Sequence, residues 1–80
     1  MSRAEAVKPS RLSGVVVMTR EDFADAIRSA WRTGMNDSLS GLPKGSQERV
    51  IGETIRLRIE NIDRRQAAAV WKAYLDGYAS

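Results

Sequence analysis

The side chains available for chemistry in this chain are those of Asp, Glu, Lys, Tyr and Ser, because its 80 residues include no Cys and no His. Disulfides, thiol nucleophiles, imidazole general bases and Cys/His metal sites are therefore excluded. No two of the remaining groups recur at a spacing that would bring them together on one apolar helix face or in a glycine-rich phosphate loop. We therefore expect no catalytic residue, no metal site and no cofactor, and we predict that the protein is not an enzyme.

The segment 36–46 is the strongest candidate for a binding loop, because long ordered connections between helices often carry function. Lys44, Gly45 and Ser46 stand directly before an expected helix N-terminus, where backbone N–H groups can hold an anion. The segment lacks the Gly-x-x-x-x-Gly-Lys-Ser/Thr order of a P-loop. We expect a connector here and no phosphate chemistry.

Arginine and aromatic residues of the types enriched at protein interfaces occur in the second half of the chain. Arg58 falls within an expected apolar helix face, where a charge must be paired, stacked on a ring or turned toward a partner. It could equally lay its stem on the core edge and extend its guanidinium into water. The aromatic residues could equally be core, and the basic pair 64–65 could be solvated. The predicted partner-binding residues are Arg58, Arg64, Arg65, Trp71, Tyr74 and Tyr78.

The central segment, 46–62, carries the most regular pattern, with isoleucines and alternating charges at helical spacing on opposite faces. Gly52 and Arg58 count against one long helix, and the alternation of apolar and charged residues over 53–60 permits a strand instead. Asn61 can take the left-handed position that ends a helix. We therefore favour a helix that continues to residue 61.

Two further helices are indicated by capping boxes, in which a side chain at the N-cap accepts a hydrogen bond from the residue three positions later. Thr19 with Asp22 begins the first of these helices, and Asp63 with Gln66 begins the other. Gly34 is available as a left-handed C-cap for the first. The sequence predicts helices near 19–34, 47–61 and 63–78.

These elements predict an all-α fold, a small three-helix domain over 18–80 that follows a flexible N-terminal arm or lead-in, 1–17. The two-residue joint 62–63 would force the last two helices into a hairpin or a steep crossing. The alternative is a small α+β domain with strands near 14–18 and 53–60. A chain of this size buries only about 60 to 65% of its unfolded surface, so we expect association, a homodimer included, to stabilise it.

The formal net charge of +3 is concentrated in the arm, where Arg3, Lys8 and Arg11 outweigh Glu5. The remaining residues carry a net charge of only +1, which is weak for a phosphate-binding domain. Nucleic-acid binding is therefore the alternative function. It would use the basic arm together with the helix arginines Arg49, Arg56, Arg64 and Arg65.

The favoured function is a non-enzymatic protein-binding module that masks or bridges a protein partner whose identity the sequence does not reveal. A small inhibitor or adaptor of the kind carried by phages and mobile elements fits the chain's size and its lack of catalytic groups. No apolar run approaches the roughly 20 residues of a membrane span, and no signal-peptide core follows the basic N-terminus. We therefore expect a cytoplasmic protein without membrane association.

Overall fold

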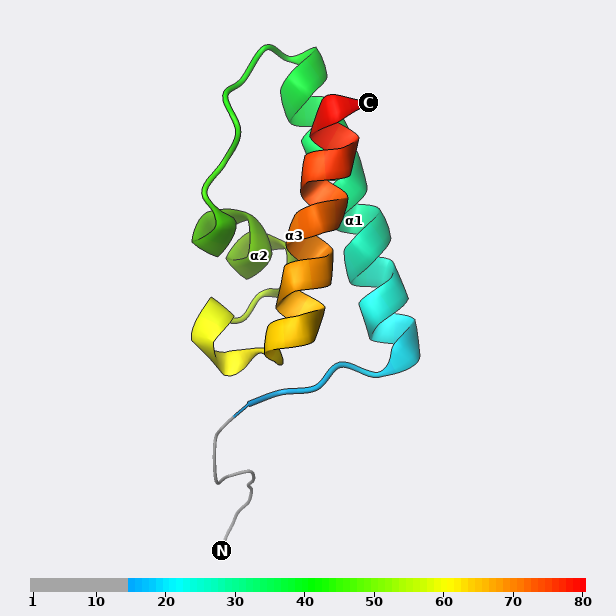
Figure 1. The fold of residues 1–80 in the computed structure, drawn as a ribbon, viewed down its shortest axis with the longest axis vertical. Coiled ribbons are helices and arrows are strands. Elements are labelled where there is room, and N and C mark those ends of the chain that lie inside the picture. The colour runs from blue at the N-terminus through cyan, green and yellow to red at the C-terminus, as the bar shows by residue number, and fades with distance from the viewer. Residues whose placement is uncertain (1–14) are drawn as a thin grey trace, which may run out of the picture.

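Three α-helices and one short 3₁₀ helix make up the fold in a computed structural model that describes residues 15–80 (Figure 1). The elements are α1 (Arg20–Leu39), α2 (Gln47–Ile55), η1 (Ile59–Asn61) and α3 (Arg64–Ala79). Helices cover 73% of the described residues, and the β-type pairing found among them is one isolated bridge between Val16 and Ile62. The all-α prediction is confirmed and the α+β alternative is wrong. The flexibility predicted for residues 1–14 concerns a segment outside the described residues.

The first and last α-helices begin where the capping boxes predict. The Thr19 hydroxyl accepts a hydrogen bond from the Asp22 N–H at 3.1 Å, and the Asp63 carboxylate accepts one from the Gln66 N–H at 3.1 Å. Each bond satisfies a backbone donor that the helix itself leaves unpaired. The predicted helix starts at 19 and 63 are therefore correct to within one residue.

The end predicted for the first helix is wrong, because α1 continues through Gly34 to Leu39. Gly34 is buried against α3, where a Cβ atom would lie 2.1 Å from the carbonyl oxygen of Tyr74. Glycine is therefore needed at this position for close helix packing, whereas the prediction used it as a helix terminator. The connection to α2 consequently shortens to residues 40–46.

The two long helices run parallel, side by side, with their N-termini at the same end of the molecule (Figure 1). Small residues recur along the contact: Ala26, Ala30 and Gly34 are buried on α1, and Ala73 and Gly77 are buried on α3. Residues of this size let two helix backbones approach closely. The parallel arrangement requires a return connection, and residues 40–62 supply it.

The predicted helix at 47–61 is also wrong in its second half, because α2 ends at Ile55. Arg56 takes the left-handed conformation, with φ of 68°, and its N–H donates to the carbonyl of Gly52. The chain then turns, and Asn61, predicted as the left-handed residue, lies in η1. Residues 56–63 therefore link α2 to α3, in place of the predicted two-residue joint. A link of this length does not force the two helices into a hairpin or a steep crossing.

The core lies between α1, α2 and α3. Its fully buried or nearly buried side chains come from all three helices and from the segment before α3. The members that fill it are Ala26, Ala30, Val50, Ile51, Ile62, Ala67, Val70, Ala73 and Tyr74.

The segment before α1 docks beside the start of α3. The Val16 N–H donates to the carbonyl of Asn61 at 2.8 Å, and the Val16 carbonyl accepts from the Asp63 N–H at 2.9 Å. No helix among the described residues is long and apolar enough to cross a lipid bilayer.

Candidate functional site

The three predicted aromatic residues of α3 form one row. The Trp71 and Tyr74 rings are stacked, with centroids 5.3 Å apart and planes 11° apart, and Tyr78 follows at 6.2 Å from Tyr74. Tyr74 has no solvent-exposed surface, whereas Trp71 and Tyr78 are partly buried. Tyr74 is therefore a core residue and is not accessible to a partner in this conformation.

The Tyr74 hydroxyl ties the loop after α1 to α3. It donates to the Asp37 carboxylate at 2.8 Å and accepts from the Gly45 N–H at 2.9 Å. Burial raises the pKa of the Tyr74 phenol above its ordinary value, the hydrogen bond from Gly45 lowers it, and the Asp37 carboxylate adds to the increase. The Tyr74 hydroxyl thus acts both as a donor and as an acceptor within the protein, and the two hydrogen bonds hold the end of α1 and the segment between α1 and α2 against α3.

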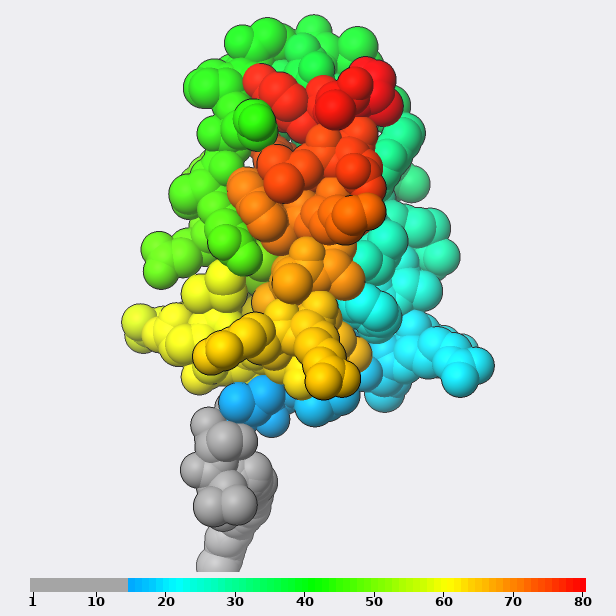
Figure 2. Space-filling view, viewed as in Figure 1, coloured from blue at the N-terminus to red at the C-terminus, as the bar shows by residue number. Residues whose placement is uncertain are grey.

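Tyr78 fixes the same loop farther along α3. Its hydroxyl donates to the carbonyl of Leu42, and the Lys44 ammonium lies 6.0 Å from the centre of the Tyr78 ring. Figure 2 shows the return connection, in green, following the upper half of α3. The predicted loop is thus an ordered connector held by two tyrosines.

Arg58 does not lie in an apolar face, because α2 ends before it. Its side chain is 80% exposed and forms an ion pair with Glu60 at 2.9 Å. Arg58 precedes η1 at one end of the molecule, while Tyr78 is in the last turn of α3 at the other. With 1.5 Å of rise per residue, the α3 segment from Arg64 to Tyr78 alone separates its two ends by about 21 Å. Arg58 and Tyr78 therefore do not form one patch.

The remaining predicted arginines are exposed and dispersed. Arg64 and Arg65 lie in the first turn of α3, Arg49 pairs with Glu53 on α2 at 3.3 Å, and Arg56 is the C-cap of α2. Neighbouring acids neutralise part of this set. The arginines of the alternative nucleic-acid site therefore come from the start and end of α2 and from the start of α3, and one of the four is paired with an acid within the described part of the chain.

A largely apolar surface is exposed on α1. Trp31 is 39% exposed and lies in a shallow hollow with a volume of about 390 Å³. We call this the Trp31 surface; its residues are Ile27, Arg28, Trp31, Arg32 and Met35.

A sequence signal for this surface exists in the spacing along α1. The small residues Ala26 and Ala30 recur at a step of four, and the large residues Ile27 and Trp31 follow each of them by one position. One position is about 100° around a helix, so the two rows cannot both face the same neighbour. Because small residues permit the closest helix contact, the small row faces α3 and the large row lies to one side of it, where Ile27 is partly buried against the core and Trp31 is exposed.

The described residues contain no cluster of three or more acidic side chains that could hold a metal ion. Comparison with known proteins gives no match: no family model, no curated protein and no solved structure resembles the chain.

Proposed function

We propose that the protein is a non-enzymatic protein-binding module whose partner docks on the Trp31 surface. The observation that carries the proposal is the exposure of Trp31 within an apolar hollow beside two arginines. Trp and Arg are the residues most enriched at interface hot spots, and Met is enriched in interface cores. We propose this surface as the partner-binding site in place of the predicted residues Arg58, Trp71 and Tyr78.

The chemistry of the surface favours a partner with an apolar centre and an acidic rim. Arg32 has no ion-pair partner among residues 15–80, and Arg28 pairs with Asp25 on the same helix. A second copy of this chain packed on the same surface about a two-fold axis would bring the same arginines together, which disfavours a homodimer through this surface. A different protein, bearing Asp or Glu around an apolar anchor, fits better.

The proposed biological setting follows from size and composition. A chain of 80 residues with no Cys and no His suits a reducing compartment, and we place its action in the cytoplasm. It would act as a small inhibitor or adaptor, of the kind that phages and mobile elements carry, by masking a partner's surface or bridging two partners.

The test is affinity capture from native-host extract, followed by titration of the captured protein in purified form against matched variants. Trp31→Ala should weaken binding by more than about 30-fold if Trp31 is a hot spot. Leu39→Ala is the control, because Leu39 lies on the same helix, is 79% exposed and is outside the Trp31 surface. The control should bind as the unmodified protein does.

Two results would overturn the proposal. A purified partner that binds both variants equally tightly would remove the Trp31 surface as its docking site. Catalytic turnover of a small molecule by the purified chain would overturn the non-enzymatic assignment itself.

A further inference from the structure

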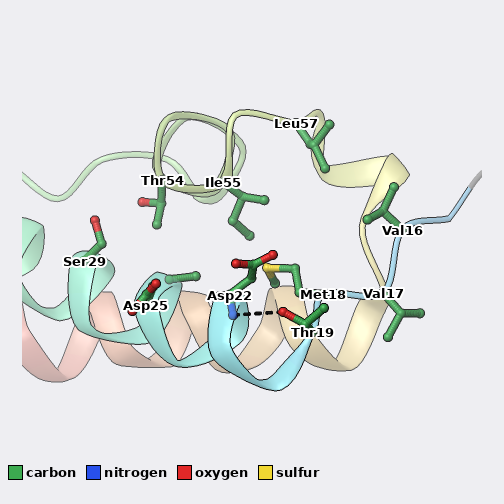
Figure 3. Close-up of a pocket in the computed structure, with 11 residues that line it drawn as sticks. Val16, Val17, Met18, Thr19, Asp22, Asp25, Ser29, Thr54, Ile55 and Leu57 are labelled. Atoms are coloured by element: carbon green, nitrogen blue, oxygen red, sulfur yellow. Dashed lines mark hydrogen bonds between the residues drawn. The ribbon is translucent and has the colours of Figure 1, made fainter.

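A groove opens on the side of α1 away from the Trp31 surface, where the lead-in, α1 and the end of α2 meet (Figure 3). Its volume is about 470 Å³. The extended segment 16–18 forms one wall, Asp22 and Asp25 project from α1, and α2 contributes the opposite wall (Figure 3). The residues used below are Val17, Asp22, Asp25, Thr54, Ile55 and Leu57.

The charge of this groove is opposite to that of the whole chain. Two carboxylates and no arginine or lysine line it, although the formal net charge of the protein is +3. Asp22 has no ion-pair partner among residues 15–80, and Asp25 pairs only with Arg28, which belongs to the Trp31 surface. The walls beside the carboxylates are aliphatic, formed by Ile55 and Leu57. A ligand with both cationic and aliphatic groups would complement this lining.

One wall also offers an unused backbone edge. Both hydrogen-bonding groups of Val16 pair with the segment before α3, and those of Met18 pair with the side-chain amide of Gln66 at 2.7 and 3.1 Å. Val17 lies between them, is 67% exposed, and makes no backbone hydrogen bond within residues 15–80. In an extended chain, the N–H and C=O groups of successive residues point to opposite sides, so those of Val17 point away from the segment that its neighbours bind.

We propose that this groove binds an extended segment of a partner protein in which arginine or lysine alternates with aliphatic residues. The segment pairs with the N–H and C=O of Val17 as an added strand. Alternate side chains of a strand project to opposite faces. Its cationic side chains therefore reach Asp22 and Asp25 while its aliphatic ones contact Ile55 and Leu57.

The groove and the Trp31 surface lie on different sides of α1, and the ion pair between Asp25 and Arg28 joins them. Asp22 and Trp31 are nine residues apart on α1, which at about 100° per residue places them on opposite sides of the helix. The two surfaces also differ in charge, since carboxylates line one and arginines flank the other. Two partners could therefore occupy the two surfaces together, as the bridging form of the proposed function requires, with Asp22 and Arg32 as the charges, unpaired among residues 15–80, that each surface offers.

The experiment titrates a short, terminally blocked peptide of alternating valine and arginine into the full ¹⁵N-labelled chain. We expect shifts of the amide signals of Val17, Asp22, Thr54 and Leu57, and no shift of the Trp31 indole signal. A peptide with glutamate in place of arginine should not bind, because it would place its carboxylates against those of Asp22 and Asp25.

Two variants with matched controls test the charge and the backbone edge separately. Asp22→Asn should weaken peptide binding about fivefold, as expected for a partly exposed ion pair, while Glu21→Gln should not. Both residues are acidic positions of the first turn of α1, so both variants change helix stability alike. Val17→Pro deletes the free N–H and should weaken binding about fivefold; Val17→Ala keeps the N–H and should bind more tightly than Val17→Pro.

Thermal melting checks the fold of each variant. If Val17→Pro unfolds the chain, N-methylation of the probe peptide removes the complementary hydrogen bond, from a peptide N–H to the Val17 carbonyl, and should weaken binding by a similar factor. Equal binding of the arginine and glutamate peptides, or unchanged affinity in Asp22→Asn, overturns the proposal. A large gain in peptide affinity on deletion of residues 1–14 would show that the chain's own basic N-terminal segment takes the groove, and would overturn the assignment to a partner.

Discussion

Gly34 of α1 lies directly against the backbone of Tyr74 on α3. A Cβ atom at Gly34 would be 2.1 Å from the Tyr74 carbonyl oxygen, a distance that requires the helices to separate. We predict that Gly34→Ala lowers the free energy of unfolding by about 3 kcal/mol, the upper end of the cost of overpacking, because backbone cannot move aside as a side chain can. Chemical denaturation measures this loss.

Gly52→Ala is the matched control for this prediction. A Cβ at Gly52 meets nothing closer than 3.6 Å, and the residue lies inside α2, where alanine is favoured over glycine by about 1 kcal/mol. Gly52→Ala should therefore stabilise the protein. If both variants gained stability, the close contact of α1 and α3 would be incorrect.

Raised pH should destabilise the protein through Tyr74. Burial raises the pKa of this phenol above its ordinary value of 10.0, so the folded state holds the proton more tightly than the unfolded chain. The stability it contributes is present below pH 10 and is lost as the pH rises through the folded pKa. Denaturation midpoints measured across this range should fall more steeply than in Tyr74→Phe.

At neutral pH, Tyr74→Phe should cost about 1 to 2 kcal/mol, because it leaves the Gly45 N–H and the Asp37 carboxylate without their common partner. Tyr78→Phe is the control that keeps Tyr74 and should keep the alkaline loss. An identical alkaline loss in all three proteins would assign it to other groups.

Removal of the Arg58 side chain should barely affect the fold. Both side chains of its ion pair with Glu60 are exposed to solvent, so Arg58→Ala should change the unfolding free energy by less than about 0.5 kcal/mol. Ile51→Ala, at a fully buried position of α2, should cost about 3 kcal/mol in the same measurement. Loss of a purified partner's binding in a fully folded Arg58→Ala would assign Arg58 to the interface after all.

Nucleic-acid binding should be weak and limited to low ionic strength. Arg49 and Arg58 are paired with glutamates, and phosphate binding weakens steeply with salt as counterions are released. Fluorescence anisotropy with a random-sequence DNA duplex should show binding that is lost on deletion of residues 1–14. Tight binding by the shortened chain at physiological salt would instead favour the alternative function.

Local signals predicted the three helix starts and the end of α3, but not the ends of α1 and α2. Thr19 and Asp63 were identifiable because a cap involves only residues within one turn. Gly34 was misassigned because a glycine that ends a helix and a glycine that permits close packing look alike until the neighbouring helix is known. The need for Gly34 comes from Tyr74, which is 40 residues away in the sequence.

The end of α2 illustrates the same difficulty at Arg58. Its charge within an apparent apolar face was evidence against a continuous helix, and the break at Arg56 removes the conflict. Ile59 and Ile62 still pack on or in the core, but they do so from η1 and the residue after it. The isoleucines at helical spacing therefore belong to two separate helices, α2 and η1, and to the residue that follows η1.

The Trp31 surface and the acidic groove were missed for another reason. Periodicity shows which residues of α1 are apolar, but only the position of α3 decides which apolar row is covered. The groove depends on three segments that are distant in the sequence, the lead-in, α1 and the end of α2.

The parallel pairing of α1 and α3 makes the main helix contact depend on a segment that is synthesised well after α1. Gly34 of α1 meets Tyr74 of α3 only after about 40 further residues have been added. At a synthesis rate of about 5 to 20 residues per second, a nascent α1 waits roughly 2 to 9 seconds for that neighbour. During this interval its apolar rows are open to chaperones, so a ribosome that stalls within α2 would hold a nascent chain that has α1 but lacks its main helix contact.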